Sequence, residues 1–174
     1  MTATKIKLES FGPENYASLI SWVESEEALM QFAGPLFKFP LTAEQLHVSL
    51  SDKNRIAYRV VDSKTGLGIG HAEIYLSEGS AKIGRILIGD KEQRGNGLGK
   101  QVVDRLLDIA FNKPGILYVE LNVFAWNLGA LMCYQKAGFT INPDKTYERK
   151  IKDKTWTAVN MSLYKAKYEK IKAN

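Results

Sequence analysis

Hydrophobic and polar positions in the first part of the chain predict one short strand followed by helices. Apolar and polar residues alternate over residues 5–9, which predicts the first strand. Apolar side chains then recur at helical spacing, and this predicts helices over residues 16–23, 26–32 and 42–50, the last opened by a capping box of Thr42 and Gln45. Residues 33–40 are rich in Gly, Pro and Phe, which predicts an apolar loop that either lines a ligand cleft or caps the core.

The pattern in the rest of the chain predicts strands with two further helices between them. Three consecutive antiparallel strands are expected over residues 56–61, 67–76 and 81–89. A long amphipathic helix from Leu98 follows, and its broad apolar stripe must pack on a sheet. The remaining expected elements are a strand over 116–124, a helix over 127–137, a strand starting at 139–141, a polar turn over 142–154 and a strand over 155–164. We therefore expect one α/β domain with a mixed sheet, spanning residues 1–174.

The composition is that of an ordinary globular protein. The 174 residues are 45% hydrophobic and 25% charged, with a formal net charge of +5. No apolar run is long enough to cross a membrane and the N-terminus lacks a signal-peptide core, so we expect a cytoplasmic protein with no membrane partner. The single cysteine, Cys133, excludes an internal disulfide, and the sequence shows no metal-ligand cluster. The basic tail over 165–172 is interpreted as a solvated end of the chain.

Three alternating glycines, Gly95, Gly97 and Gly99, stand between the third of these strands and the long helix. Backbone without side chains lets a ligand approach closely, and a helix that begins there directs unpaired N–H groups at the ligand. This glycine elbow therefore predicts an anion site, most simply for phosphate. A Walker loop is excluded because Gln101 follows Lys100, and a dinucleotide fingerprint is disfavoured because Lys100 stands where the third glycine belongs.

A second motif narrows the interpretation to one family. The segment Asn-x-x-Ala-x-x-x-Tyr-x-x-x-Gly-Phe runs from Asn127 through Tyr134 to Phe139. Together with Arg94-Gly95-Asn96-Gly97-Leu98-Gly99, it resembles the signatures of the GNAT superfamily of N-acetyltransferases, within the branch of ribosomal-protein N-terminal and spermidine N-acetyltransferases. The motifs lie within residues 83–139. The resemblance implies the GNAT fold, a mostly antiparallel central sheet with a splayed parallel pair, flanked by helices.

The resemblance also implies acetyl-CoA as the cosubstrate, without a metal. The elbow N–H groups would hold its pyrophosphate, and the end of the preceding strand would pair with its pantetheine arm. Asn127, which is also suited to cap its helix, would bond that arm. The implied cofactor-binding residues are Leu87, Ile88, Gly89, Arg94, Gly95, Asn96, Gly97, Leu98, Gly99, Lys100 and Asn127.

The implied reaction is direct attack of a primary amine on the thioester, which requires an acid and a base. Tyr134 is predicted to protonate the leaving thiolate, with a purely structural core tyrosine as the alternative. Glu73 is predicted as the general base, and His71 is a second candidate; either could instead be a polar side chain on a solvated strand face. Cys133 is disfavoured as a nucleophile because no histidine lies near it in sequence.

The predicted function is therefore an acetyl-CoA-dependent N-acetyltransferase acting on a small amine, a polyamine or a protein N-terminus. Acidic residues would suit a polyamine, and Glu24, Glu26 and Glu27 offer them, although a helix-end charge cluster is the favoured interpretation of these three residues. The alternative is a non-catalytic acyl-CoA-binding or sensing module on the same fold. Nucleic-acid binding is disfavoured because the elbow lacks interleaved aromatics. A homodimer is compatible with the sequence but not indicated by it.

Overall fold

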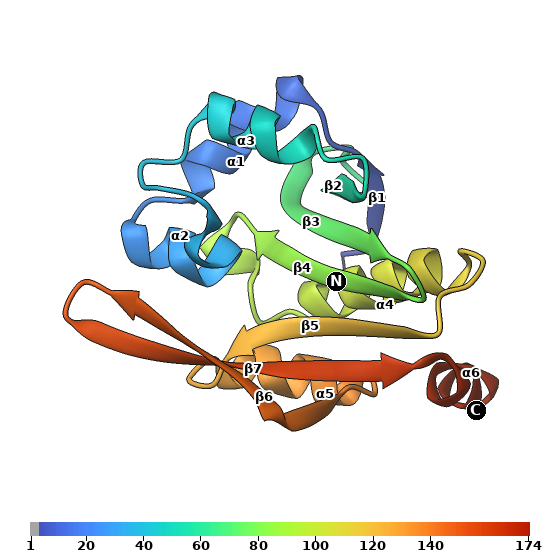
Figure 1. The fold of residues 1–174 in the computed structure, drawn as a ribbon. Coiled ribbons are helices and arrows are strands. Elements are labelled where there is room, and N and C mark those ends of the chain that lie inside the picture. Colours follow the sequence, from blue (N-terminus) through green and yellow to red (C-terminus); the bar gives the residue numbers. More distant parts are fainter. Residues whose placement is uncertain (1–3) are drawn as a thin grey trace.

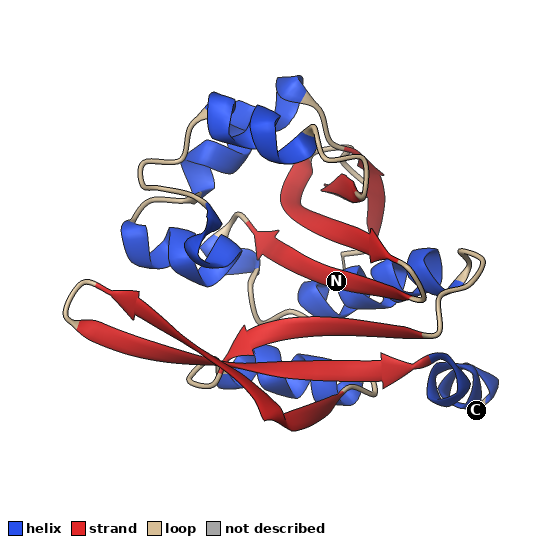
Figure 2. Ribbon diagram, in the orientation of Figure 1, coloured by secondary structure: helices blue, strands red, loops and turns tan. Residues whose placement is uncertain are grey.

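Seven strands form one sheet in the computed structural model, which describes residues 4–174 (Figures 1 and 2). The strand order is β1-β2-β3-β4-β5-β7-β6, and every neighbouring pair is antiparallel except β4 with β5. The strands are β1 (Ile6–Ser10), β2 (Arg55–Asp62), β3 (Gly68–Ser77), β4 (Ser80–Ile88), β5 (Tyr118–Phe124), β6 (Thr140–Ile151) and β7 (Lys154–Tyr164). The predicted mixed sheet with a single parallel pair is confirmed.

Helices pack against this sheet in two groups. They are α1 (Tyr16–Trp22), α2 (Glu26–Ala33), α3 (Ala43–Leu50), α4 (Leu98–Phe111), α5 (Leu128–Lys136) and α6 (Lys165–Ala173), with short 3-10 turns at Pro13–Asn15, Gly34–Leu36 and Lys91–Gln93. The apolar stripe of α4, which includes Val102 and Leu106, packs into the main core on one face of the sheet. Helices α1 to α3 gather at one end of the sheet around a second core (Figure 1). Within residues 4–174, no helix is long and apolar enough to cross a membrane.

The parallel strands β4 and β5 separate soon after they meet. Their pairing extends only over Ser80–Lys82 with Tyr118–Glu120. Beyond it, β4 bulges against β3, because the register shifts between His71 and Glu73 and Arg85 adopts a left-handed backbone conformation with φ 48°. The two strands therefore diverge after this short pairing, as the predicted splayed pair requires.

One expectation for the last third of the chain is wrong. The predicted polar turn over 142–154 is mostly strand, since β6 runs to Ile151 and absorbs Pro143 in an irregularity between Asn142 and Thr146. The basic tail forms the helix α6, and its lysines are mostly exposed, in agreement with the interpretation of a solvated end. Tyr168 of this helix packs against Phe111 with ring centroids 4.6 Å apart, which ties the tail to α4.

Candidate active site

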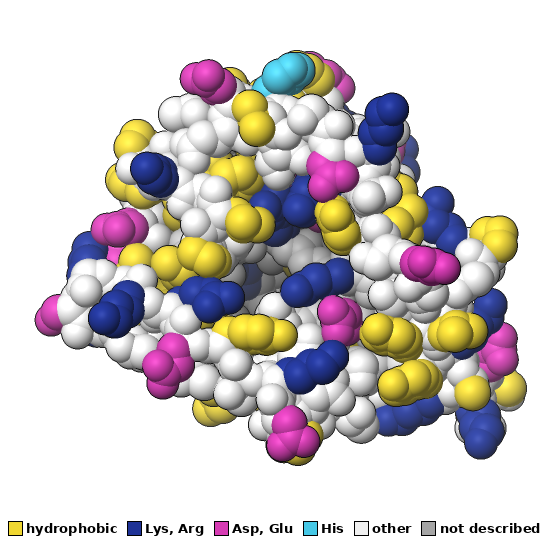
Figure 3. Space-filling model, viewed as in Figure 1, with side chains coloured by type: hydrophobic (Ala, Val, Ile, Leu, Met, Phe, Trp, Pro, Cys, Tyr) yellow, Lys and Arg dark blue, Asp and Glu magenta, His cyan; other side chains and the backbone are white. Residues whose placement is uncertain are grey.

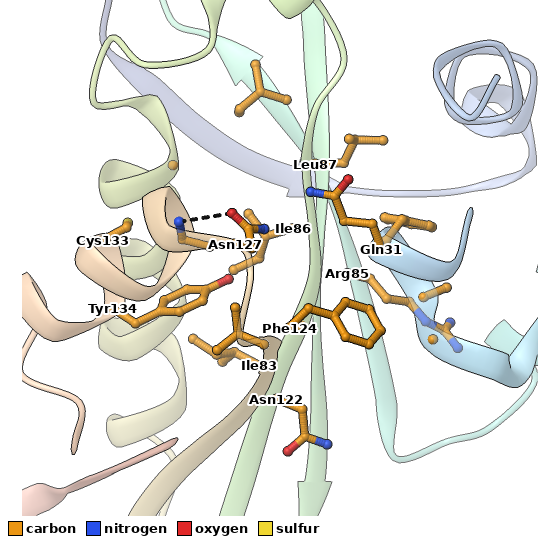
Figure 4. Close-up of a pocket in the computed structure, with 18 of the residues that line it drawn as sticks. Gln31, Ile83, Arg85, Ile86, Leu87, Asn122, Phe124, Asn127, Cys133 and Tyr134 are labelled. Atoms are coloured by element: carbon orange, nitrogen blue, oxygen red, sulfur yellow. Dashed lines mark hydrogen bonds between the residues drawn. The ribbon is translucent and has the colours of Figure 1, made fainter. Parts of the chain in front are cut away.

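A cavity of about 1300 Å³ opens where β4 and β5 separate. It is lined by the diverging strands, the glycine elbow, α5, the segment from Trp22 to Leu36 and the β6–β7 hairpin. Figure 4 shows Tyr134 and Asn127 of α5 on one side of the gap, and Arg85 and Gln31 on the other. The gap thus connects two halves of the cavity. One half lies beside Tyr134 and Asn127, and the other lies beside Arg85 and Gln31.

The elbow has the backbone geometry that an anion site requires. Gly95 and Gly97 adopt left-handed conformations with φ 79° and 77°, which only glycine enters freely. Helix α4 begins at Leu98 without a side-chain cap from Gly97, so its first-turn N–H groups remain available at the cavity wall. A Cβ atom placed on Gly95, Gly97 or Gly99 would meet nothing within 4 Å, so space is open over all three.

Most of the predicted cofactor-binding residues line this cavity. They are Leu87, Ile88, Arg94, Gly95, Gly97, Leu98, Gly99, Lys100 and Asn127. Gly89 and Asn96 are not among the lining residues.

Gly89 has a packing role. A Cβ atom at this position would lie 2.2 Å from the ring of Trp22, so glycine is needed for α1 to approach the end of β4. The Gly89 N–H donates to Ile69 O at 2.8 Å, and alternation along the strand then directs the N–H of Ile88 toward the gap. The Arg94 side chain donates through Nε to Ile88 O at 2.8 Å, which ties the elbow to the strand end.

Helix α5 brings two predicted residues to the other wall. The Asn127 side chain accepts a hydrogen bond from the Ala130 N–H at 3.2 Å, so it caps the helix as expected (Figure 4). Tyr134 is half-buried, packs edge-on against Phe139 and points its hydroxyl toward the gap. Burial, and then the neighbouring Cys133, raise the pKa of this phenol, so it remains protonated. Burial also raises the pKa of the Cys133 thiol, which argues against a nucleophilic thiolate.

Glu73 lies at the cavity wall but is held by cations. Its side chain is only 3% exposed and forms ion pairs with Arg55 Nη1 at 2.7 Å and Arg85 Nη1 at 3.1 Å. Its Oε1 lies 2.9 Å from His71 Nε2. Burial alone would raise its pKa, but the His71 hydrogen bond and the charge of Arg85 outweigh it and lower the Glu73 pKa to about 2. Neither Glu73 nor His71 sits on a solvated face, so that alternative is wrong.

The other base candidate, His71, is fully buried between Phe11 and Phe32. It does not line the cavity, so it reaches the site only through Glu73. The two arginines that hold Glu73 were missed by the sequence reasoning. Arg85 is a charged residue inside a predicted strand and Arg55 immediately precedes one, and that was the one signal that could have found them.

Two of the three acidic residues expected to suit a polyamine are paired with lysines at the surface. Glu24 pairs with Lys91 Nζ at 2.5 Å, and Glu27 pairs with Lys152 Nζ at 2.5 Å. Of the three acidic residues, only Glu24 lines the cavity. Among residues 4–174, no group of three metal-ligating side chains is brought together.

Comparison with known sequences defines the class of protein. The family described as "Acetyltransferase (GNAT) domain" matches residues 5–140. The chain therefore belongs to the GNAT acetyltransferase domain family. It is similar to aminoglycoside N(6')-acetyltransferase type 1 of Klebsiella pneumoniae, with 28% identity over 130 residues, covering 72% of this chain and 64% of that protein. The chain thus spans less than two thirds of the relative it matches. A kanamycin resistance protein of Rhizobium radiobacter is 36% identical over 52 residues, covering 30% of this chain and 48% of that protein.

Solved structures share the fold over nearly the whole chain. Aminoglycoside acetyltransferase AAC(6')-Ib in complex with coenzyme A has a TM-score of 0.75 at 22% identity, covering 95% of this chain and 98% of that one. Spermidine N-acetyltransferase from Vibrio cholerae, in complex with CoA and spermine, has a TM-score of 0.77 at 20% identity, covering 94% of this chain and 98% of that one. At this level of identity the likeness establishes the fold.

Proposed function

We propose that this chain is an acetyl-CoA-dependent N-acetyltransferase that transfers acetyl directly to a primary amine. The observation that carries the proposal is the β4–β5 gap, with uncapped helix N–H groups at one end and the Tyr134 hydroxyl directed into it. Family membership supports the same function, since the two motifs that define the site, residues 94–99 and 127–139, lie within residues 5–140.

The elbow fits the pyrophosphate of acetyl-CoA. Its left-handed glycines keep the backbone open to a close ligand, and the first turn of α4 supplies N–H groups and the positive end of the helix dipole. Arg94, Lys100 and Lys136 line the same part of the cavity and add positive charge. The gap-facing backbone near Ile88 would pair with the amides of the pantetheine arm like an added strand. The Asn127 amide group, whose oxygen caps α5, would bond the same arm.

The reaction follows from these positions. The neutral amine nitrogen attacks the thioester carbonyl carbon, and the C–S bond breaks when the tetrahedral intermediate collapses. The nitrogen loses one proton as the amide forms, and the leaving thiolate gains one, so the products are the N-acetylated amine and CoA. Tyr134 stays protonated at neutral pH, and its hydroxyl is the group that we assign as the proton donor to sulfur.

The prediction that Glu73 is the general base stays a prediction, and its surroundings argue against it. A carboxylate with a pKa of about 2 is a weak proton acceptor, and its oxygens are occupied by Arg55, Arg85 and His71. We therefore assign Glu73 as a positioning residue for the two arginines. The ammonium form of the acceptor, with a pKa near 10, would lose its proton to water before attack.

A non-catalytic acyl-CoA sensor is the second candidate, and turnover separates the two. We expect CoA release from acetyl-CoA in the presence of a primary amine, measured over a panel of amino acids, polyamines, aminoglycosides and peptides with free N-termini. Tyr134→Phe should lower kcat about hundredfold with the CoA Kd nearly unchanged, because the phenol acts only on the leaving group. Tyr164→Phe, an exposed tyrosine outside the cavity, is the matched control. Tight CoA binding without turnover on any amine would favour the sensor.

A further inference from the structure

Positive charge extends beyond the elbow into the half of the cavity that would receive the acceptor. Eight cationic and two acidic residues line the cavity. Lys91, Arg94, Lys100 and Lys136 lie on the elbow side, where phosphates would bind. The other cations are Arg55, Lys82, Arg85 and Arg149, which phosphates at the elbow do not explain. Figure 3 shows dark blue side chains around the hollow on this face.

Three strands bring part of this charge together on one face of the sheet. Arg55 pairs with Tyr75 and Tyr75 pairs with Lys82, so these side chains form a row across β2, β3 and β4. The Arg55 guanidinium lies 5.2 Å from the centroid of the Tyr75 ring in this row and 2.7 Å from Glu73 in the next. In the next row Glu73 pairs with Gly84, and a Cβ atom on Gly84 would meet nothing within 4 Å. The floor of this half of the cavity is therefore open beside the cations.

Among the residues that line the cavity, the positive and negative charges do not cancel. Glu73 is shared between two guanidiniums, Arg55 and Arg85, which leaves one positive charge in excess. Across residues 4–174 no carboxylate forms an ion pair with Lys82 or Arg149. The Lys82 Nζ instead lies 3.0 Å from the end of the Asn122 side chain and donates to its oxygen when that amide is turned. Asn122 lies at the gap (Figure 4), so Lys82 is fixed at its edge.

This charge pattern defines the class of acceptor, given the proposed function. A polyamine would place two or more positive charges against an excess of cations, which is electrostatically unfavourable in a partly desolvated cavity. We propose that the acceptor carries an anionic group, a carboxylate or a phosphate monoester, in the same small molecule as its amine. The anion binds over Gly84 between Lys82 and Arg55, and the amine faces the β4–β5 gap beside Asn122.

Calorimetry on the protein loaded with CoA tests this without turnover. The probes share a short chain and differ in charge: 4-aminobutyrate, 3-aminopropyl phosphate, 4-aminobutyramide and 1,4-diaminobutane. At least one anionic probe should bind about tenfold or more tightly than the neutral amide, which corresponds to one charge-assisted hydrogen bond. The diamine should bind most weakly. The two anionic probes distinguish a carboxylate from a phosphate source.

Two lysine variants locate the site. Lys82→Gln should reduce the preference for the anionic probe over the amide about tenfold. Lys150→Gln removes the same charge from an exposed β6 residue outside the cavity and should leave the preference intact. Equal loss in both variants, equal or undetectable binding of all four probes, or tighter binding of the diamine would overturn the inference. Failure of the proposed function would give a different result. The protein would still prefer the anionic probes, but it would release no CoA from acetyl-CoA.

Discussion

Glu73 lines the cavity, and two arginines, Arg55 and Arg85, hold its carboxylate there. Its position in a strand ahead of the cofactor strand was enough to predict that it lies at the site, and it does line the cavity. Its chemistry depends on Arg55 and Arg85, which are distant in sequence and meet it only through the pairing of β2, β3 and β4. The position of Tyr134 at the site could be predicted because the motif that contains it spans only residues 127–139. The partners of Glu73 could not be, since register is a property of the folded sheet.

The ion pairs of Glu73 make a testable contribution to stability. Its pKa is lowered from 4.5 to about 2 on folding, so the contribution is full above pH 4.5 and is lost as the pH falls toward 2. Glu73→Gln should lower the free energy of unfolding at pH 7 by about 3 kcal/mol, because two guanidiniums lose their counter-charge. The difference from wild type should shrink between pH 4.5 and pH 2. Urea unfolding across this range measures it.

An exposed glutamate provides the control for that series. Glu78→Gln, at the β3–β4 turn, should change the unfolding free energy little at any pH. If Glu73→Gln proves too unstable to study, Arg55→Gln removes one ion-pair partner of Glu73. It should also reduce the loss of unfolding free energy between pH 4.5 and pH 2. A Glu73→Gln protein as stable as wild type at pH 7 would show that the ion pairs contribute nothing.

At the scale of elements, patterns within a few residues were sufficient to predict a helix or strand. Elements that depend on contacts between residues distant in sequence could not be predicted. The elbow, α4 and α5 follow from glycine placement, capping and helical spacing, all of which act within a few residues. The continuation of β6 beyond residue 141 was missed because Pro143-Asp144 resembles a turn, whereas the alternation of Tyr147, Arg149 and Ile151 in fact continues the strand. α6 was missed because its apolar residues are few. Its stability depends on Tyr168, which stacks on Phe111 and hydrogen-bonds Asp108, contacts invisible in the local sequence.

The elbow can be tested with two glycines of the same backbone geometry. Gly97 has φ 77° at the start of α4, and Gly79 has φ 75° in the β3–β4 turn outside the cavity. Either change to alanine should cost about 1 kcal/mol of stability, the usual penalty for a left-handed residue with a Cβ atom. Gly97→Ala alone should weaken CoA binding, by about tenfold or more, because its Cβ atom would occupy space next to the helix N–H groups. Equal CoA affinity in both variants would show that the elbow does not contact the cofactor.

At the scale of the whole molecule, the cofactor would join two half-sheets that barely touch. β4 and β5 pair only over Ser80–Lys82 and Tyr118–Glu120, so the sheet depends on α4 and the core to cross the gap. A ligand bound to both sides should stabilise the fold by mass action. At a CoA concentration about 100 times its Kd the gain is about 2.7 kcal/mol, which raises Tm by about 5–10 °C for a chain of this size.

Thermal unfolding with and without CoA measures this gain. Adenosine lacks both the pyrophosphate and the thiol arm, so at the same concentration it should leave Tm nearly unchanged. An equal shift with adenosine, or none with CoA, would mean that the elbow and the gap do not bind the cofactor as described.

The most direct measurement of the account is the stoichiometry of acetyl transfer. Acetyl-CoA and a primary amine accepted by the protein are incubated together, and free CoA and N-acetylated amine are quantified in the same sample by mass spectrometry. We predict one acetylamine for each CoA released, with both rates reduced together in Tyr134→Phe. CoA bound at the elbow with no acetylamine formed, or CoA released by hydrolysis alone, would contradict it.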